Sequence, residues 1–234
     1  MVLKKDKKLI IFGTGEIGSL ARFYFENDSP YQVVGFTADD EFIQNDTFED
    51  LPLVKLSILR DRFPSSEYYM HVALSYRKLN KVRADKYVMA KNMKYKLASY
   101  VCSRTVTWPG LEMGDNCFIL ENQTIQPNVK IGNNVMIWSG NHIGHASQIG
   151  DHSYVGSHVV ICGHVRIGKR CFLGVNSTIK DFTRIGHDVF VAMGAQVTRD
   201  IPDGAVVFAA KSEVHLADSK VAQYLKKAYF YLTN

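Results

Sequence analysis

A run of hexads occupies residues 119–197, which read ILENQT IQPNVK IGNNVM IWSGNH IGHASQ IGDHSY VGSHVV ICGHVR IGKRCF LGVNST IKDFTR IGHDVF VAMGAQ V. Every hexad opens with Ile, Val or Leu, and no residue is inserted or lost between one hexad and the next. Gly often takes the second position, and the fifth position usually holds a small side chain. Such an unbroken sixfold repeat is the signature of a parallel β-helix.

The sixfold period predicts a triangular prism in which each hexad forms one short strand and one corner. Three hexads, or 18 residues, then complete one coil, and each coil covers the strand edges of its neighbour. We expect the opening aliphatic side chains to point inward and to stack from coil to coil, and Gly to let the chain turn without a Cβ penalty. The small fifth-position residues should also point inward: Val129, Val135, Ser147, Ser153, Val159, Val165, Cys171, Ser177, Thr183, Val189 and Ala195.

Composition places the chain among ordinary globular proteins. The 234 residues are 46% hydrophobic and 22% charged, which are globular values. The net charge of +5 suits ligands that carry phosphate and is too small and too dispersed to favour DNA or RNA. The sequence shows no signal peptide and no apolar stretch long enough to span a membrane. No zinc-ligand spacing joins the cysteines, so we expect a reduced, cytoplasmic protein; they are Cys102, Cys117, Cys162 and Cys171.

A glycine-rich turn near the N-terminus points to a phosphate-binding loop. An apolar strand is expected over residues 8–12, and a helix over residues 19–27. Between them lie Gly13, Gly15 and Gly18, in the GxGxxG spacing. Strand, glycine turn and helix form the context in which this motif holds a phosphate against the first amides of a helix. A tight turn without a ligand is the alternative.

Two acidic residues follow the second expected strand, residues 31–38. Asp39 and Asp40 stand at its carboxyl end, where an acid in dinucleotide-binding folds contacts a ribose. The α/β region is too short for a full two-half dinucleotide fold, so we expect a nucleotide-linked ligand in place of NAD acting as a hydride carrier. Residues 1–98 are therefore predicted to form a Rossmann-like half-domain that binds a nucleotide-linked ligand.

The remaining elements are expected as follows. A third strand covers residues 69–75, a polar helix covers 77–91, and a short strand covers 97–101. Residues 99–212 should form the β-helix and 213–234 a C-terminal segment whose helix, 214–232, packs on the prism through one apolar face; that face holds Val221, Leu225, Ala228 and Tyr229. Three basic residues after the third strand either add positive charge for the ligand or form an ordinary solvated helix face: Arg77, Lys78 and Arg83.

The histidines of the prism differ in their place within the hexad. His152, His158 and His164 share the fourth position of successive hexads. They therefore point from different faces and do not converge within one subunit, and we expect no metal site. A zinc site between subunits remains an alternative, because zinc needs three or four converging ligands.

His145 is the candidate general base. It stands beside a glycine turn, and Gly163 lies 18 residues later, one coil along. Adjacent strands are about 4.8 Å apart, so a peptide N–H at Gly163 can face the same pocket as the imidazole. A neutral imidazole removes a proton from an attacking group, and an N–H holds the oxyanion of a tetrahedral intermediate. This pairing is what acyl transfer from a thioester requires. His142 is the second choice, either as base or as a hydrogen-bonding partner.

These motifs together resemble the bacterial sugar acyltransferases of the NeuD and PglD kind. The sharpest match runs from His145 to Gly150 and from Gly163 to Ser177, and the resemblance extends to about Lys211. It implies a left-handed parallel β-helix, acetyl-CoA as acyl donor, and a nucleotide-linked amino sugar as acceptor in surface glycan or lipopolysaccharide synthesis. It also implies a homotrimer in which the donor lies between neighbouring prisms.

The resemblance assigns roles to residues of this sequence. His145 matches the catalytic histidine of the family, and Gly163 matches the backbone amide near the thioester. The stretch from Gly13 to Gly18 matches the nucleotide-sugar loop, and Asp39 and Asp40 match the acidic pair.

The sequence departs from the family pattern at three places. Ala146 stands where the family has an acid directly after the catalytic histidine, which leaves Asn141, His142 or a partner subunit to orient the imidazole. The closing motif, which ends in Lys211, lacks the Gly and Pro of the family's GxPAK, and the acidic turn is one residue longer.

The leading hypothesis from the resemblance is an N-acetyltransferase. The alternatives are a sugar O-acetyltransferase, a non-catalytic nucleotide-sugar-binding trimer, and a metalloenzyme built on the same prism.

Overall fold

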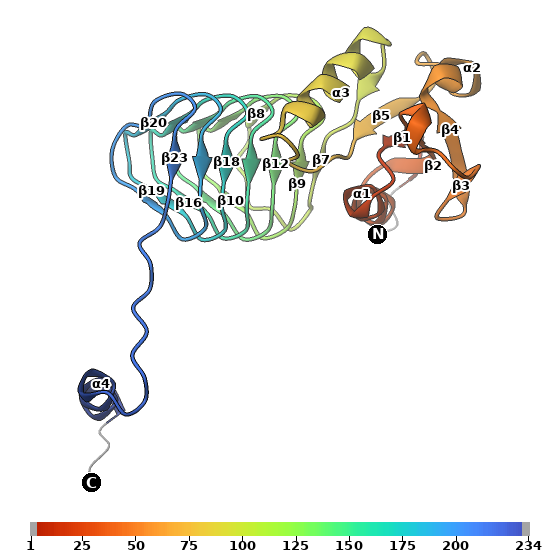
Figure 1. Ribbon diagram of the computed structural model, residues 1–234. Helices are drawn as coiled ribbons and strands as arrows, with labels where there is room; N and C mark the ends of the chain where they lie inside the picture. The colour runs from red at the N-terminus through yellow and green to blue at the C-terminus, as the bar shows by residue number, and fades with distance from the viewer. Residues whose placement is uncertain (1–3, 231–234) are drawn as a thin grey trace.

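A computed structural model describes residues 4–230. In Figure 1, a small α/β sheet region joins one end of a long coil of short strands, and a single helix hangs from the other end. None of the helices in the described part is both long enough and apolar enough to cross a membrane.

The N-terminal region is built on one mixed sheet. Its strand order is β3-β4-β2-β1-β5-β6, and every neighbouring pair is parallel except β3 with β4. The strands are β1 (Lys7–Phe12), β2 (Tyr31–Ala38), β3 (Thr47–Phe48), β4 (Leu51–Lys55), β5 (Tyr69–Val72) and β6 (Lys96–Leu97). The helices are α1 (Glu16–Asn27), α2 (Leu59–Arg62) and α3 (Lys81–Asn92), with 3-10 turns η1 (Asp40–Phe42) and η2 (Leu56–Ile58).

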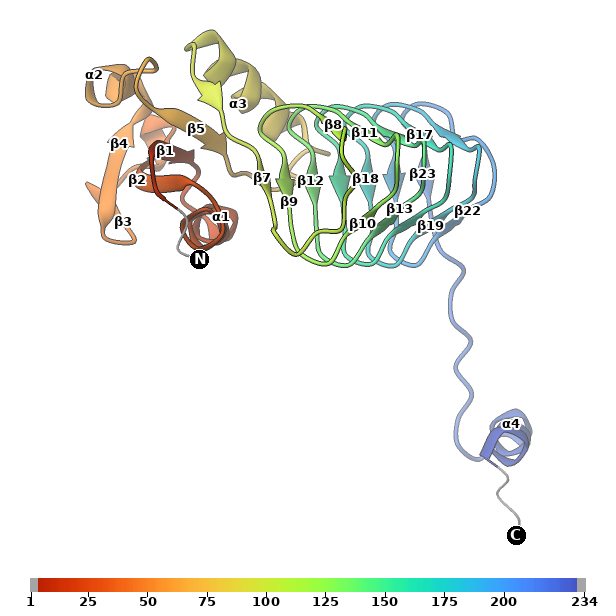
Figure 2. The same ribbon diagram turned by 180° about the vertical axis from the view of Figure 1, so that it is seen from behind.

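The rest of the chain, up to β23, forms a coil of parallel two-residue strands. Pairs such as Ile125 with Ile143 are 18 residues apart and lie in register, so one coil takes three hexads. Strands of the three walls run side by side along the column (Figure 2). Their bounds are β7 (Tyr100–Val101), β8 (Glu112–Met113), β9 (Phe118–Ile119), β10 (Thr124–Ile125), β11 (Lys130–Ile131), β12 (Met136–Ile137), β13 (His142–Ile143), β14 (Gln148–Ile149), β15 (Tyr154–Val155), β16 (Val160–Ile161), β17 (Arg166–Ile167), β18 (Phe172–Leu173), β19 (Thr178–Ile179), β20 (Arg184–Ile185), β21 (Phe190–Val191), β22 (Gln196–Val197) and β23 (Val206–Val207).

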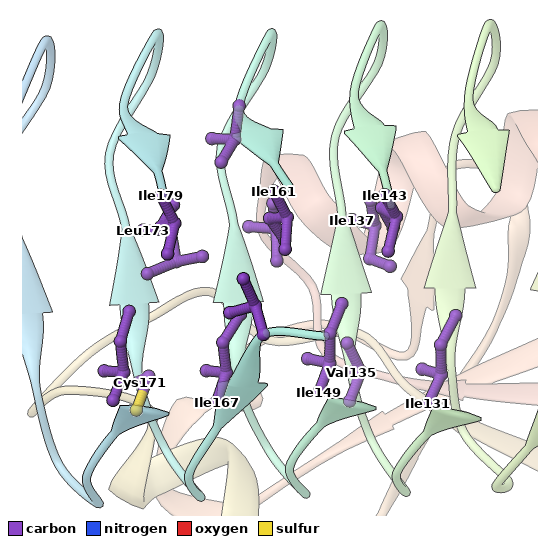
Figure 3. Close-up of a cluster of buried hydrophobic side chains, with 14 of the residues drawn as sticks. Ile131, Val135, Ile137, Ile143, Ile149, Ile161, Ile167, Cys171, Leu173 and Ile179 are labelled. Atoms are coloured by element: carbon purple, nitrogen blue, oxygen red, sulfur yellow. The ribbon is translucent and has the colours of Figure 1, made fainter. Parts of the chain in front are cut away.

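The interior of the coil is made by the first and fifth residues of the hexads. Ile137, Ile143 and Ile161 are fully buried, and they stack with their equivalents along the column (Figure 3). The small fifth-position side chains face the same interior, and Val135 and Cys171 are also fully buried. Burial of a large aliphatic side chain contributes about 1.5–3 kcal/mol, so the repeated ladder is the main stabilising element. The predicted fold class is confirmed.

The corners differ from the expectation that second-position Gly makes the turn. Positive φ angles recur at the fourth position of the hexads, as at Ala146 (φ 55°) and Phe182 (φ 58°). Second-position Gly is needed for another reason, because a Cβ on Gly144 would lie 2.5 Å from the backbone carbon of Cys162 in the next coil. The role predicted for these glycines is therefore wrong: they allow close approach of coils, and the left-handed turn falls two residues later.

Side chains of α3 join the N-terminal region to the coil. The Asn80 amide donates to the Cys171 carbonyl at 3.0 Å, and the buried Arg83 donates to the carbonyls of Asn134 and, at 2.9 Å, of His152. Burial lowers the pKa of Arg83 to about 10, so its guanidinium remains charged at neutral pH. The suggestion that Arg83 supplies charge to a ligand is wrong, because the coil carbonyls surround it.

The C-terminal helix also differs from the expectation. Helix α4 (Lys220–Phe230) follows an extended segment and lies away from the coil in both views (Figures 1 and 2). Residues 214–219, which were predicted to belong to this helix, are not helical. Val221 is 46% and Leu225 is 42% exposed, so the expected packing on the prism of the same chain is wrong. Positions 231 and 232 of the predicted helix lie outside the described residues, and so does the side chain of Tyr229.

Candidate functional site

His145 stands on an exposed corner of the coil, three residues after β13 begins. The chain leaves β13 at Ile143, passes through the close contact at Gly144, and turns at Ala146 in the left-handed conformation. The Ala146 N–H donates to the Pro127 carbonyl of the preceding coil at 3.0 Å. The imidazole is therefore carried by a short, fixed segment, and it faces solvent in the single chain.

Gln126 holds the histidine from the preceding coil. Its Oε1 accepts the His145 backbone N–H at 2.8 Å and lies 3.2 Å from the Nδ1 of the same residue. Gln126 was not predicted from the sequence, because its place one coil and one residue before His145 does not show which way its side chain points. Of the partners proposed for His145, Asn141 is committed elsewhere, since its side chain binds the Trp138 carbonyl and the Val159 N–H.

Gly163 lies directly beneath the imidazole. A Cβ at Gly163 would be 2.6 Å from His145 Cε1 and 3.0 Å from each ring nitrogen. The Gly163 N–H donates no hydrogen bond to any residue in the range 4–230. Thus a ring able to exchange a proton and a backbone donor lie within the same corner of the coil.

A basic and aromatic hollow adjoins this corner. Residues Ala146, His164, Arg166, Phe182 and Arg184 surround a volume of about 180 Å³. The His164 ring stands edge-on to His145, with 4.9 Å between ring centroids, and it stacks on Phe182 at 4.8 Å. Within the described residues, neither arginine forms an ion pair with an acid. The hollow therefore presents two cations and a flat ring face, which suits an anionic ligand with an aromatic group.

His142 lies on β13 and is half-buried. It pairs through its backbone with Thr124 and Val160, and in the described part of the chain its ring forms no hydrogen bond with His145. His142 is thus close to His145 in the sequence, but no hydrogen bond joins the two imidazoles in the described residues.

The glycine loop closes β1 onto α1. Gly13 has a φ of 126°, and its N–H donates to the Thr37 carbonyl at 2.8 Å. Gly18 is packed so closely that a Cβ would lie 2.2 Å from the Gly13 carbonyl oxygen. Gly15 caps α1 without a side-chain cap and faces open space. Beside it lies a hollow of about 560 Å³ lined by Thr14, Gly15, Glu16, Ser19, Leu20, Phe23 and Phe48.

The two acidic residues sit at the same edge of the sheet as the glycine loop, because β1 and β2 are parallel neighbours. Each carboxylate already has a protein partner. Asp39 binds the Lys86 ammonium, and Asp40 accepts the Ser57 N–H at 3.1 Å and the Ser57 hydroxyl at 2.5 Å. These hydrogen bonds from Ser57 lower the pKa of Asp40. Asp39 therefore ties the end of β2 to α3, and Asp40 ties it to η2.

The remaining candidates lie apart from this corner. Lys211 is exposed beyond β23. His152 faces Arg83 and Tyr87, and burial lowers its pKa to about 4. The described residues contain no group of three or more His, Cys, Asp or Glu side chains placed to hold a metal ion.

Comparison with known proteins adds the repeat and the fold. The family model described as "Bacterial transferase hexapeptide (six repeats)" matches residues 110–145 and 128–163. The model described as "Hexapeptide repeat of succinyl-transferase" matches residues 164–199. Residues 110–199 therefore match the hexapeptide repeats of transferases. A curated relative, the bifunctional protein GlmU of Rhizobium rhizogenes, is 41% identical over 56 residues, which span 24% of this chain and 12% of that relative.

Solved structures share the complete arrangement of N-terminal region and hexapeptide repeats. PerB from Caulobacter crescentus, in complex with CoA and GDP-perosamine, has a TM-score of 0.78 at 20% identity, covering 90% of this chain and 98% of that one. The acetyltransferase domain of PglB from Neisseria gonorrhoeae, in complex with acetyl coenzyme A, has a TM-score of 0.75 at 19% identity, covering 88% and 99%. WeeI from Acinetobacter baumannii has a TM-score of 0.73 at 21% identity, covering 89% and 100%. The resemblance predicted from the sequence is confirmed at the level of fold and repeat.

Proposed function

We propose that the protein transfers an acetyl group from acetyl-CoA to the amine of a nucleotide-linked amino sugar. The observation that carries this proposal is the position of the His145 imidazole over Gly163, whose N–H has no acceptor among residues 4–230. Acyl transfer needs a base and an oxyanion donor within reach of one carbonyl group. The structural neighbours in complex with CoA, acetyl coenzyme A and GDP-perosamine support this choice of donor and acceptor class.

The proposed reaction uses both groups in sequence. The sugar amine attacks the thioester carbonyl carbon, and His145 accepts the proton that the amine loses. The Gly163 N–H donates to the oxygen that becomes negative in the tetrahedral intermediate. The C–S bond then breaks, and the leaving sulfur takes a proton from the imidazolium, which yields an acetamido sugar and free CoA.

The hollow beside His145 is the proposed site for the phosphates of the donor. Arg166 and Arg184 are paired in register on β17 and β20 and have no acidic partner among the described residues. A volume of about 180 Å³ is smaller than the 300–1,000 Å³ or so typical of ligand pockets. A wall supplied by another copy of the chain would complete it, which supports the proposal of a homotrimer with the donor between neighbouring coils.

The glycine loop is the proposed acceptor site. Gly15 leaves the first amides of α1 open beside the larger hollow, and such amides favour phosphate groups. Because Asp39 and Asp40 are bound to Lys86 and Ser57, we propose that they shape the loop for the nucleotide and take no direct part in the transfer.

A coupled assay tests this function directly. Release of the CoA thiol is followed with a chromogenic thiol reagent, with acetyl-CoA and a panel of nucleotide-linked amino sugars, and the product is identified by NMR. We expect acetamide formation, a loss of roughly 10²–10⁴-fold in His145→Ala, and a KM for acetyl-CoA raised at least tenfold with kcat retained in Arg166→Ala/Arg184→Ala. An ester product would establish O-acetylation instead. Binding of both ligands without thiol release from any sugar would favour the non-catalytic trimer.

A further inference from the structure

The imidazole of His145 lacks the acidic neighbour that would ordinarily fix its orientation, because residue 146 is alanine. We propose that Gln126 is a positioning residue that holds His145 with its proton on Nδ1 and leaves Nε2 free to accept a proton. This inference rests on the proposed function, since it assigns the base a specific nitrogen. The side chains of Asn141 and His142, the partners suggested by the sequence, make no contact that would do so.

The backbone decides which way the Gln126 amide points. The His145 N–H can only donate, and it lies 2.8 Å from the Gln126 side-chain oxygen. Placing the NH₂ group of Gln126 there would set donor against donor, so Oε1 is fixed by the main chain and not only by the imidazole. The same oxygen lies 3.2 Å from Nδ1 of His145. An oxygen can only accept, so the Nδ1 atom must carry the hydrogen.

The support beneath Gln126 is rigid. Ile125 is 1% exposed and anchors the residue to the interior of the coil. Pro127 follows, its φ restricted by its ring, and its carbonyl accepts the Ala146 N–H at 3.0 Å. Two hydrogen bonds therefore join this segment to residues 145 and 146, one to Gln126 and one to Pro127. They leave the Gln126 side-chain amide little freedom to change its position.

The choice of an amide has a chemical consequence. A carboxylate at this place would orient the ring and also stabilise the imidazolium through its negative charge, whereas an amide orients the ring alone. The ring of His164 stands beside the His145 ring from the next coil, and Arg166 and Arg184 line the adjoining hollow. No acid among the described residues lies in that group. Gln126 thus orients the imidazole of His145, but it supplies no negative charge that would stabilise the imidazolium.

Three variants test this inference: Gln126→Ala, Gln126→Glu and, as a matched control, Gln196→Ala. Gln196 is an exposed glutamine on β22, in the same wall as β10, and it lies outside the site. For Gln126→Ala we expect kcat to fall at least tenfold while the KM for acetyl-CoA changes less than twofold. Gln126→Glu keeps an acceptor oxygen, so it should recover most of kcat and move the acidic limb of the pH–rate profile to higher pH. Gln196→Ala should match the parent chain.

A spectroscopic measurement separates this inference from the function on which it rests. In protein labelled with ¹⁵N-histidine, the His145 signal is assigned by its loss in His145→Ala, and its one-bond and two-bond couplings report which nitrogen carries the hydrogen. We expect the Nδ1–H form in the parent chain and a shift toward Nε2–H in Gln126→Ala. An Nε2–H form in the parent chain, or full kcat in Gln126→Ala, would overturn the inference. Because the NMR reading needs no turnover, an Nδ1–H form in an inactive protein would defeat the proposed function alone.

Discussion

Substitution of Gly163 by alanine offers the sharpest test of the proposed corner. The new Cβ would lie 2.6 Å from His145 Cε1, and all three of its nearest neighbours are atoms of that imidazole. Gly163 is not among the glycines with positive φ, so the backbone accepts alanine without strain. The exposed histidine side chain is the part that must move, and the fold should remain intact.

The size of the effect follows from the geometry. Ordinary contact begins near 3.4 Å, so the ring must shift by about 3.4 − 2.6 = 0.8 Å. A displacement of about 1 Å of a catalytic group can cost roughly 10²-fold in rate. This corresponds to about 2.7 kcal/mol of transition-state stabilisation. We therefore expect kcat for thiol release to fall about a hundredfold, with a melting temperature within about 3 °C of the parent.

Two comparisons make the result interpretable. Gly174→Ala places a Cβ 2.4 Å from the Met193 backbone nitrogen, so it should lower stability, by roughly 1–3 kcal/mol as overpacking does. His145→Ala/Gly163→Ala should be no slower than His145→Ala alone, since the methyl group then has no ring to displace. Full activity in Gly163→Ala, or an extra loss in the double variant, would refute the arrangement of ring over glycine.

Two further predictions concern stability. Arg83→Ala removes buried hydrogen bonds to the carbonyls of Asn134 and His152 and should lower the free energy of unfolding by roughly 2–4 kcal/mol; urea denaturation checks this, and an unchanged midpoint would contradict it. Burial lowers the pKa of His71 to about 4, so the unfolded chain binds a proton that the folded chain rejects between about pH 6.5 and pH 4. Stability should be full above about pH 6.5 and fall by about 3 kcal/mol as the pH drops to about 4, and His71→Gln should flatten the part of this slope that His71 causes.

The coil could be predicted from the sequence because large aliphatic core residues recur at the first position of every hexad. Ile143, Ile161 and Ile179 each occupy the first place of a hexad, and each is fully buried. No other element needs to be known for that pattern to make sense. Strand β2 was predicted with its observed bounds because it is rich in aromatic and β-branched residues and lies between turn residues.

The edge strand β3 and its neighbour β4 were missed because their residues carry no such pattern. Pro52 and a charged turn at Glu49 and Asp50 interrupt the region, and β4 is recognisable only from its pairing with β2 and β3. Helix α3 was recognised, but the burial of Arg83 was not. A basic residue in a polar helix is normally solvated, and only the coil carbonyls that meet it explain why this one is buried.

The candidate site was visible only in part. The 18-residue spacing of His145 and Gly163 placed them one coil apart, and the structure brings the ring over the glycine. Gln126 lies one coil and one residue before His145. Its side chain reaches the histidine only by leaning along the wall of the coil, and spacing alone does not show that direction. Ala146 has a positive φ, and it shares the hollow with His164 of the next coil and Phe182 of the coil after that.

The 18-residue coil has a consequence for how such a protein can change in length. Gln126 and His145 meet because one circuit of the chain, plus one residue, separates them. Losing or gaining a single residue between them would move the glutamine toward a different wall and break its contact with His145. A whole extra circuit added beyond either residue would lengthen the column and leave them facing each other, so insertions of eighteen are the ones that this architecture can absorb without loss of its chemistry.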